Sequence, residues 1–227
     1  LGLALPIISL VIAFANLFGM GGAPLCSIYR GKGNDQEAEA VMGAAFILLL
    51  ISGIILTIAG LLLMKPLLYL FGASDATYPF AKEYLSVYLL GSPFVMLGLG
   101  MNSFINAQGF GKVGMSTVLL GAVANIILDP IFIFVFGMGI RGAAIATVIS
   151  QILSAIWILR FLTGTRTILR LRYSGSFLSA SRIRQITGLG MSGFMMSITN
   201  CAVQIVCNAS LSKYGGDLYV GVMTIIN

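Results

Sequence analysis

The stretch Ser116 to Met138, STVLLGAVANIILDPIFIFVFGM, decides how this chain folds. It is long enough to cross a lipid bilayer as a helix, which takes roughly 20 mostly apolar residues. Its one charged residue is Asp129, and Pro130 follows directly. An Asp at the centre of a membrane helix costs roughly 2.5–3.5 kcal/mol. The carboxylate therefore needs a polar partner, water or a bound proton.

Small or polar residues recur at intervals of four in this stretch, so they share one helix face. They are Thr117, Gly121, Asn125 and Asp129. Because Pro130 has no N–H, the carbonyl of Ile126 is left as a free acceptor one turn from the carboxylate. The pattern predicts a cation or proton site inside a membrane helix. The alternative is that Asp129 only fixes a kink or caps a helix end.

The composition is that of a polytopic membrane protein. Of 227 residues, 58% are hydrophobic and 9% are charged, against about 25% charged in soluble domains. The net charge of +6 indicates loop topology and not nucleic-acid binding. The absence of histidine excludes His-based metal sites and proton relays. Both ends lie in apolar runs, so we expect a fragment of a longer protein.

Six apolar runs are long enough to span a membrane, and a seventh begins near the C-terminal end. The runs are 1–29, 41–64, 84–107, 116–138, 143–161, 186–211 and 218–227. We expect turns or loops at 30–39, 108–114, 137–142 and 213–217, and a longer connection at 65–83. Basic residues concentrate at 30–39, 108–114 and 160–184, which the positive-inside rule places in the cytoplasm.

An arginine-rich stretch, TRTILRLRYSGSFLSASRIR at 165–184, divides the chain into two lobes. We expect it to lie on the inner membrane surface, attracted by anionic headgroups; binding of a regulator is the alternative. The expected parts are an N-terminal lobe at 1–162, a cytoplasmic linker at 163–184 and the start of a C-terminal lobe at 185–227. A short repeat supports this division, since VGVMTII at 220–226 resembles LGLALPI at 1–7.

Neighbouring runs carry polar stripes that can complete a site around Asp129. One stripe is Gly98, Asn102 and Asn106, and the other is Ala143, Thr147 and Gln151. Carboxylate, amide and hydroxyl oxygens are ligands for a small cation such as Na⁺, and the same amides would hydrogen-bond a protonated Asp. The alternative for each of these residues is hydrogen bonding between helices.

The run at 186–211 has a polar face of its own. Its members are Ser197, Asn200, Gln204 and Asn208, followed by Ser212. The stripe has no acid, so it suits a wet cavity for neutral or amphipathic cargo better than a second ion site. Packing between helices explains it equally well.

The chain resembles the multidrug and toxic compound extrusion (MATE) transporters along its whole length. The matching motifs are NIILDP at 125–130, GIRGAAIAT at 139–147, NSFINAQGFGK at 102–112 and GAPLCSIYRGKG at 22–33. The family has twelve helices in two six-helix lobes. The resemblance implies an all-α, polytopic transmembrane bundle, a two-lobed inverted-V transporter here missing its first helix and last four helices.

The resemblance also implies a cation site in the first lobe. Its members here are Asn102, Asn125, Asp129 and Thr147, with Na⁺ possible at the last three, and the family adds an Asp from helix one that this sequence does not contain. Asn200 stands where one branch of the family carries an acid on helix seven, which argues against an ion site of that type in the second lobe.

These observations predict a secondary active antiporter that exports drugs or toxic organic cations in exchange for H⁺ or Na⁺. The predicted protein is a multi-pass, monomeric plasma-membrane protein that contacts lipids and amphipathic or cationic drugs, with no cofactor beyond the coupling ion. The alternatives are a lipid-linked oligosaccharide flippase of the same superfamily and a membrane channel or sensor. An enzyme is not expected, since no span holds a nucleophile with a base or paired acids.

Overall fold

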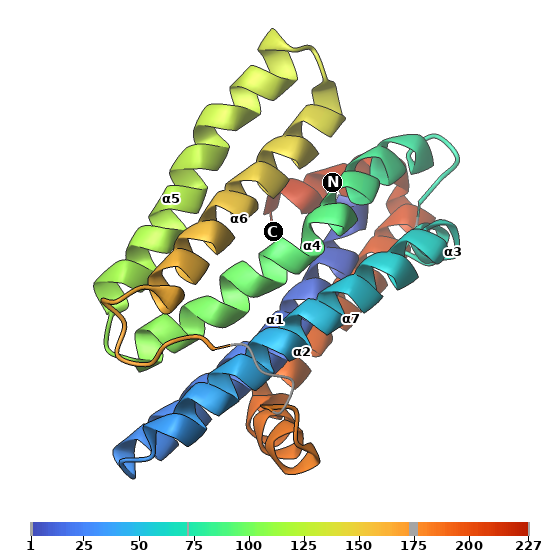
Figure 1. Ribbon diagram of the computed structural model, residues 1–227. Helices are drawn as coiled ribbons and strands as arrows, with labels where there is room; N and C mark the ends of the chain where they lie inside the picture. Colours follow the sequence, from blue (N-terminus) through green and yellow to red (C-terminus); the bar gives the residue numbers. More distant parts are fainter. Residues whose placement is uncertain (1, 72, 173–176, 227) are drawn as a thin grey trace.

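The protein is built from helices that run back and forth along a common direction (Figure 1). The computed structural model describes residues 2–71, 73–172 and 177–226, with side chains described up to residue 211. The elements are η1 (Gly2–Ala4), α1 (Leu5–Gly31), α2 (Asp35–Leu62), α3 (Met64–Leu70), α4 (Tyr78–Ala107), α5 (Gly111–Pro130), the π-helical η2 (Ile131–Val135), α6 (Gly139–Thr163) and α7 (Ala180–Ile226). In this described part, six helical segments are long and apolar enough to span a membrane. The all-α, polytopic fold class is therefore confirmed.

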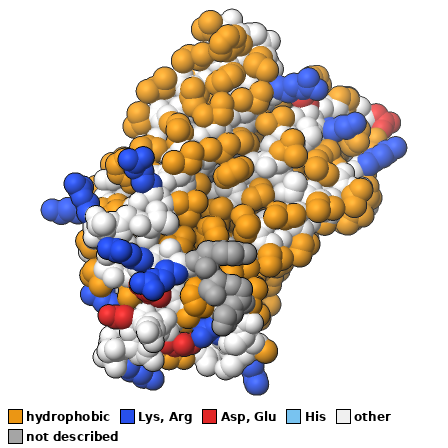
Figure 2. Space-filling view, in the orientation of Figure 1, with side chains coloured by type: hydrophobic (Ala, Val, Ile, Leu, Met, Phe, Trp, Pro, Cys, Tyr) orange, Lys and Arg blue, Asp and Glu red, His pale blue; other side chains and the backbone are white. Residues whose placement is uncertain are grey.

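Helix α4 lies at the centre and contacts α1, α2, α5 and α6. Its fully buried side chains form much of the core: Leu85, Leu89, Met96, Met101, Phe104 and Ile105. Helices α5 and α6 form a pair on one side of α4, and α7 lies along α1 on the other (Figure 1). Apolar side chains cover the long flanks, and Lys and Arg gather toward the helix ends (Figure 2).

Helix α1 is held by close backbone contact at glycines. A Cβ on Gly19 would lie 2.7 Å from the Cα of Gly100 in α4. A Cβ on Gly190 of α7 would overlap the carbonyl of Leu17, and one on Gly21 would overlap that of Ile186. Small residues permit such approach between membrane helices, where packing replaces the hydrophobic effect. These contacts fix α1 between α4 and α7.

Several boundaries differ from those predicted by the sequence. Helix α2 begins inside the expected loop at 30–39, because the side chain of Asn34 caps it by accepting a hydrogen bond from the backbone N–H of Glu37 (3.1 Å). The expected connection at 65–83 contains α3 and the first turn of α4. The expected turn at 213–217 is wrong, since α7 continues to Ile226. Glycine costs only about 1 kcal/mol in a helix and need not end one.

The span predicted at 116–138 is interrupted after Pro130 by a π-helical segment. Helix α5 ends at Pro130 and η2 follows, with the N–H of Phe136 donating to the carbonyl of Ile131 (3.0 Å). Wider i→i+5 bonding is one way a helix accommodates an interruption. The chain then turns through Gly137 and Gly139, whose φ angles of +64° and +55° favour glycine. This turn brings α6 back beside α5.

The segment between α6 and α7 is docked on the N-terminal lobe. The side-chain carbonyl of Gln108, at the end of α4, accepts hydrogen bonds from the hydroxyl of Thr167 (2.8 Å) and from the backbone N–H groups of Ile168 (3.1 Å) and Leu169 (2.9 Å). Glu39 of α2 accepts from the N–H of Arg170 (3.0 Å) and pairs with the Arg172 side chain (3.1 Å). Within the linker predicted at 163–184, residues 164–172 form no α-helix, and α7 begins at Ala180.

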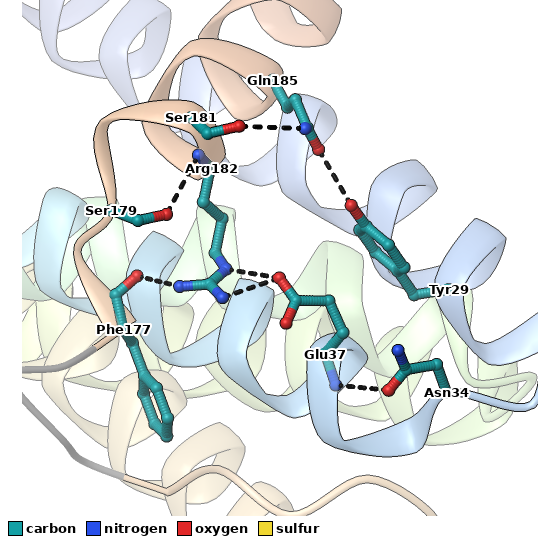
Figure 3. Close-up of polar contacts among 8 residues, drawn as sticks. All are labelled: Tyr29, Asn34, Glu37, Phe177, Ser179, Ser181, Arg182 and Gln185. Atoms are coloured by element: carbon teal, nitrogen blue, oxygen red, sulfur yellow. Dashed lines mark hydrogen bonds and ion pairs between the residues drawn. The ribbon is translucent and has the colours of Figure 1, made fainter.

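The start of α7 is tied to α1 and α2 (Figure 3). One carboxylate oxygen of Glu37 accepts from Nε (2.9 Å) and Nη2 (2.6 Å) of Arg182, whose side chain is only 13% exposed. The same guanidinium donates to the carbonyl of Phe177. Beside this pair, the hydroxyl of Tyr29 donates to the Gln185 side chain (3.1 Å). The charged pair thus joins the N-terminal lobe to the predicted linker, and the Tyr29–Gln185 bond joins it to the first residue of the predicted C-terminal lobe.

Replacing Gly190 with Ala should destabilise the protein, because the added methyl would overlap the backbone of Leu17. We expect a loss of about 1–3 kcal/mol, typical of overpacking, seen as a lower thermal unfolding midpoint of the intact transporter in detergent. Gly188→Ala is the matched control, since nothing lies within 4 Å of a Cβ there. Equal midpoints for the two variants would show that the α1–α7 crossing is not as close as described.

Glu37→Gln should cost about 1–2 kcal/mol in the same assay, since it leaves the enclosed Arg182 without its counter-charge. Glu83→Gln is the control, because Glu83 is as exposed as Glu37 (35% against 33%) but pairs with Arg141, which is 63% exposed. That variant should change stability by less than about 0.5 kcal/mol. A loss of the same size in both would argue that the Glu37 pair is no stronger than an ordinary surface pair.

Candidate functional site

The candidate ion site lies where α5 and α6 face each other. The side-chain NH₂ of Asn125 donates to Oδ1 of Asp129 (3.3 Å) on its own helix and to Oγ1 of Thr147 (3.5 Å) on α6. The Thr147 hydroxyl in turn donates to the carbonyl of Ala143 (2.9 Å). The spacing of four on α5 produces the first contact, and the antiparallel return of α6 produces the second. The structure therefore brings together three of the predicted residues.

A polar cavity of about 270 Å³ lies next to this cluster, between α4, α5 and α6. Its polar lining consists of Asn102, Thr117, Asn125, Thr147, Ser150, Gln151 and Ser154. The side-chain oxygen of Asn102 is buried and has no hydrogen-bond partner among the described residues. A buried acceptor without a partner costs free energy unless a water or a cation meets it. The cavity thus offers a place for a hydrated ion beside Asn125.

Two of the predicted residues lie at the ends of this region. Asp129 is half-buried and lies outside the lining of the cavity, one turn from Asn125 toward η2. Asn106 is exposed at the C-terminal end of α4, where its side-chain oxygen lies against Gly114 of α5. The structure therefore places Asn102 and Gln151 at the cavity but not Asn106.

Sequence reasoning missed three residues of this region. Ser150 and Ser154 line the cavity from α6, and both are buried. With Thr147 and Gln151 they form an i, i+3, i+4, i+7 face, which was the available signal. Tyr84 of α4, also buried, lies near both Thr147 and Asp129. A lone tyrosine in an apolar run gave no such signal.

A second cavity, of about 370 Å³, lies between α1 and α7. Its lining includes Ser197, Asn200 and Gln204, predicted from the polar stripe, and Ser9 from α1. Hydrogen bonds join the two helices here: Ser9 donates to Gln204 (3.0 Å) and Asn16 donates to Ser197 (3.1 Å). The stripe was interpreted either as the wall of a cavity or as packing between helices. The structure contains both features, since these residues line a cavity and also form hydrogen bonds with α1.

The fourth residue of that stripe, Asn208, lies apart from the cavity. It is buried, and its side chain donates to the carbonyl of Gly2 (3.1 Å). Its contacts are those of a packing residue. The side chain of Ser212 lies outside the described residues.

Comparison with known proteins agrees with this architecture. The MatE family model matches residues 1–131, more than half of the chain. The multidrug export protein MepA of Staphylococcus saprophyticus subsp. saprophyticus is 29% identical over 215 residues, which are 95% of this chain and 48% of that protein. MepA of Staphylococcus haemolyticus is 27% identical over the same shares. The chain thus spans about half the length of these curated relatives.

Solved structures show the same fold. A multidrug resistance MATE family transporter of the MOP superfamily, in an inward-facing conformation, superposes with a TM-score of 0.92 at 27% identity, over 98% of this chain and 51% of the other. The MATE multidrug transporter DinF-BH gives a TM-score of 0.92 at 32% identity, over 100% and 51%. Together with the family-model match, these likenesses show that the chain belongs to the MatE family of MATE transporters and is a multi-pass protein of the plasma membrane.

Proposed function

We propose that this chain forms the ion-coupling half of an antiporter that exports drugs or toxic organic cations in exchange for H⁺ or Na⁺ by alternating access. The observation that carries the proposal is the Asn125 amide, which bonds both the Asp129 carboxylate and the Thr147 hydroxyl across two membrane helices. An intramembrane acid held by polar partners beside a cavity is typical of ion pathways. The printed names of the relatives, multidrug export protein and multidrug transporter, support drugs as cargo.

The direction of the hydrogen bonds bears on which ion couples transport. Asn125 presents its NH₂ group to Asp129 and Thr147. A proton can occupy the other carboxylate oxygen without disturbing these bonds. Sodium needs oxygen ligands, so the amide would have to turn its carbonyl toward the carboxylate. The present arrangement needs less rearrangement for H⁺, and Na⁺ requires one amide rotation.

Ion binding would act on the part of the lobe that is packed least tightly. Helix α5 is the least buried of the six spans, and η2 follows Asp129 directly. Neutralising Asp129 changes the charge at this break and so biases the two conformations of the lobe. One positive charge that enters the cell gains roughly 2.3 kcal/mol per 100 mV, so the membrane potential adds to the driving force when more positive charge enters with the ions than leaves with the cargo.

The cavity between α1 and α7 is the proposed contact for cargo. Its residues are neutral, and its volume of about 370 Å³ is at the small end of the range for drug-sized sites, about 300–1,000 Å³. An uncharged, partly polar lining suits varied amphipathic molecules. We expect the transporter to act as a monomer among membrane lipids, with no cofactor beyond the coupling ion.

Asp129→Asn in the intact transporter should abolish ion-driven efflux while the protein stays folded, because the amide cannot change charge. Efflux of a fluorescent organic cation from reconstituted vesicles measures this, with a pH gradient in one arm and a Na⁺ gradient in the other. The arm that drives the wild-type protein identifies the ion. Asp75→Asn, the same change in the connection before α4, is the control and should transport normally. Efflux by Asp129→Asn at the wild-type rate would refute the proposal.

Gln204→Leu should weaken binding of cargo, because one polar group of the α1–α7 cavity is lost. Loss of one hydrogen bond corresponds to about a 3- to 10-fold rise in KM for a cationic dye, with kcat and ion dependence unchanged. Thr199→Val, on the same helix but outside the cavity lining, is the control. An unchanged KM for Gln204→Leu would leave this face a packing surface only.

A further inference from the structure

A third cavity, of about 490 Å³, lies where α6 ends and the linker begins. Its lining is Trp157, Arg160, Phe161, Gly164, Thr165 and Arg166. The cavity is at the end of α6 that the basic loops mark as cytoplasmic. It shares no lining residue with the two cavities described above. Ion coupling and cargo binding therefore do not account for it.

The walls of this cavity are held in place by contacts on both sides. Phe161 packs edge-to-face against Phe110, with ring centroids 5.2 Å apart. Gly164 allows the chain to turn tightly, since a Cβ added at this position would lie only 3.0 Å from the carbonyl oxygen of Arg160. The backbone N–H of Leu171 then returns to the carbonyl of Leu162 (2.9 Å).

The hydrogen bonds from residues 167–169 to Gln108 complete this anchoring. Arg166 lies between the Gly164 turn and these bonds, so its backbone is fixed beside the last turn of α6. The two arginines of the cavity are therefore carried on anchored backbone and not on a free tail.

Both arginines are without a counter-charge. The ion pairs among the described residues use Arg141, Arg172 and Arg182. Arg160 and Arg166 have no acidic or hydrogen-bonding side-chain partner in that part of the chain, and both are exposed. Guanidinium groups favour phosphate, which they can bind in a two-point fashion. Two such groups on one cavity predict an anionic, phosphate-bearing ligand.

An apolar surface adjoins these charges. Leu153, Ile156 and Trp157 lie on one face of α6 and are 43%, 55% and 44% exposed. The face leads from the cavity toward the middle of the membrane span, and Trp is typical of the level of the headgroups. A soluble phosphate ion would leave this apolar surface uncovered, whereas the acyl chain of a lipid would pack against it.

We propose that this cavity binds an anionic phospholipid of the inner leaflet, with its phosphate between Arg160 and Arg166 and one acyl chain along Leu153 and Ile156. Basic pockets at the cytoplasmic side of membrane helices bind such headgroups. The lipid would join the end of α6 to the linker. The proposal does not depend on the ion or the cargo of the transporter.

The test uses native mass spectrometry of the intact transporter, released from vesicles of phosphatidylcholine alone or with phosphatidylglycerol added. We expect the wild-type protein to retain phosphatidylglycerol in preference to phosphatidylcholine. Arg160→Gln combined with Arg166→Gln should lower retention about tenfold or more, since each basic residue near the surface contributes to binding of anionic lipid. Excess inorganic phosphate should not displace the lipid.

The matched control is Arg170→Gln combined with Arg184→Gln, which removes the same charge from exposed linker and α7 positions outside the cavity. This control should retain the lipid. Equal loss in both double variants would overturn the proposal in favour of general surface charge, and displacement by phosphate would show a simple anion site. If the cavity double variant fails to fold, Trp157→Ala with both arginines intact should still lower retention, and unchanged retention would again overturn the proposal.

Discussion

Close backbone contact at glycines is the constraint on which the rest of the structure depends. Apolar side chains gain little by leaving lipid for another helix, so contact between backbones carries much of the association. Gly19 against Gly100, and Gly21 against the start of α7, leave no room for a Cβ. Helix α1 is therefore fixed between α4 and α7. Helices α5 and α6, which carry the candidate ion site, are attached to this fixed centre largely through α4.

The number of helices was predictable because length and hydropathy determine which segments can span a membrane. Their ends were not, because polar residues near a span can continue it. Asn34 begins α2 well before the expected loop ends, and α3 forms at the start of the stretch predicted only as a connection. A pair of glycines suggested a turn at 213–217, but α7 is continuous from Ala180 to Ile226. Local turn signals are weaker than the tendency of a buried backbone to stay hydrogen-bonded.

The site was predictable as far as helical spacing reaches. The interval of four placed Asn125 beside Asp129, and the short turn after η2 allowed Thr147 to face them. The spacing of residues within one helix could not predict how helices distant in the sequence are aligned with one another. Tyr84 lies near Thr147 and Asp129 only because α4 packs against α5 and α6 at that depth, and Asn106 lies too far along α4 to line the cavity. The contacts of the predicted linker with Gln108 and Glu37 likewise depend on tertiary packing, which no sequence motif predicts.

Packing explains why the candidate ion site lies on α5 rather than on the central helices. A charge that appears and disappears needs surroundings that can yield, and close packing at α1 and α4 would resist such change. Helix α5 is the least buried span and ends in a π-helical segment. Gly142 of α6 lies directly against that segment, since a Cβ added at Gly142 would be 2.7 Å from the carbonyl of Phe132. A shift of the backbone near Asp129 must therefore move the start of α6. The proposed response to ion binding would then lie in the α5–α6 pair, with the glycine-fixed centre as its support.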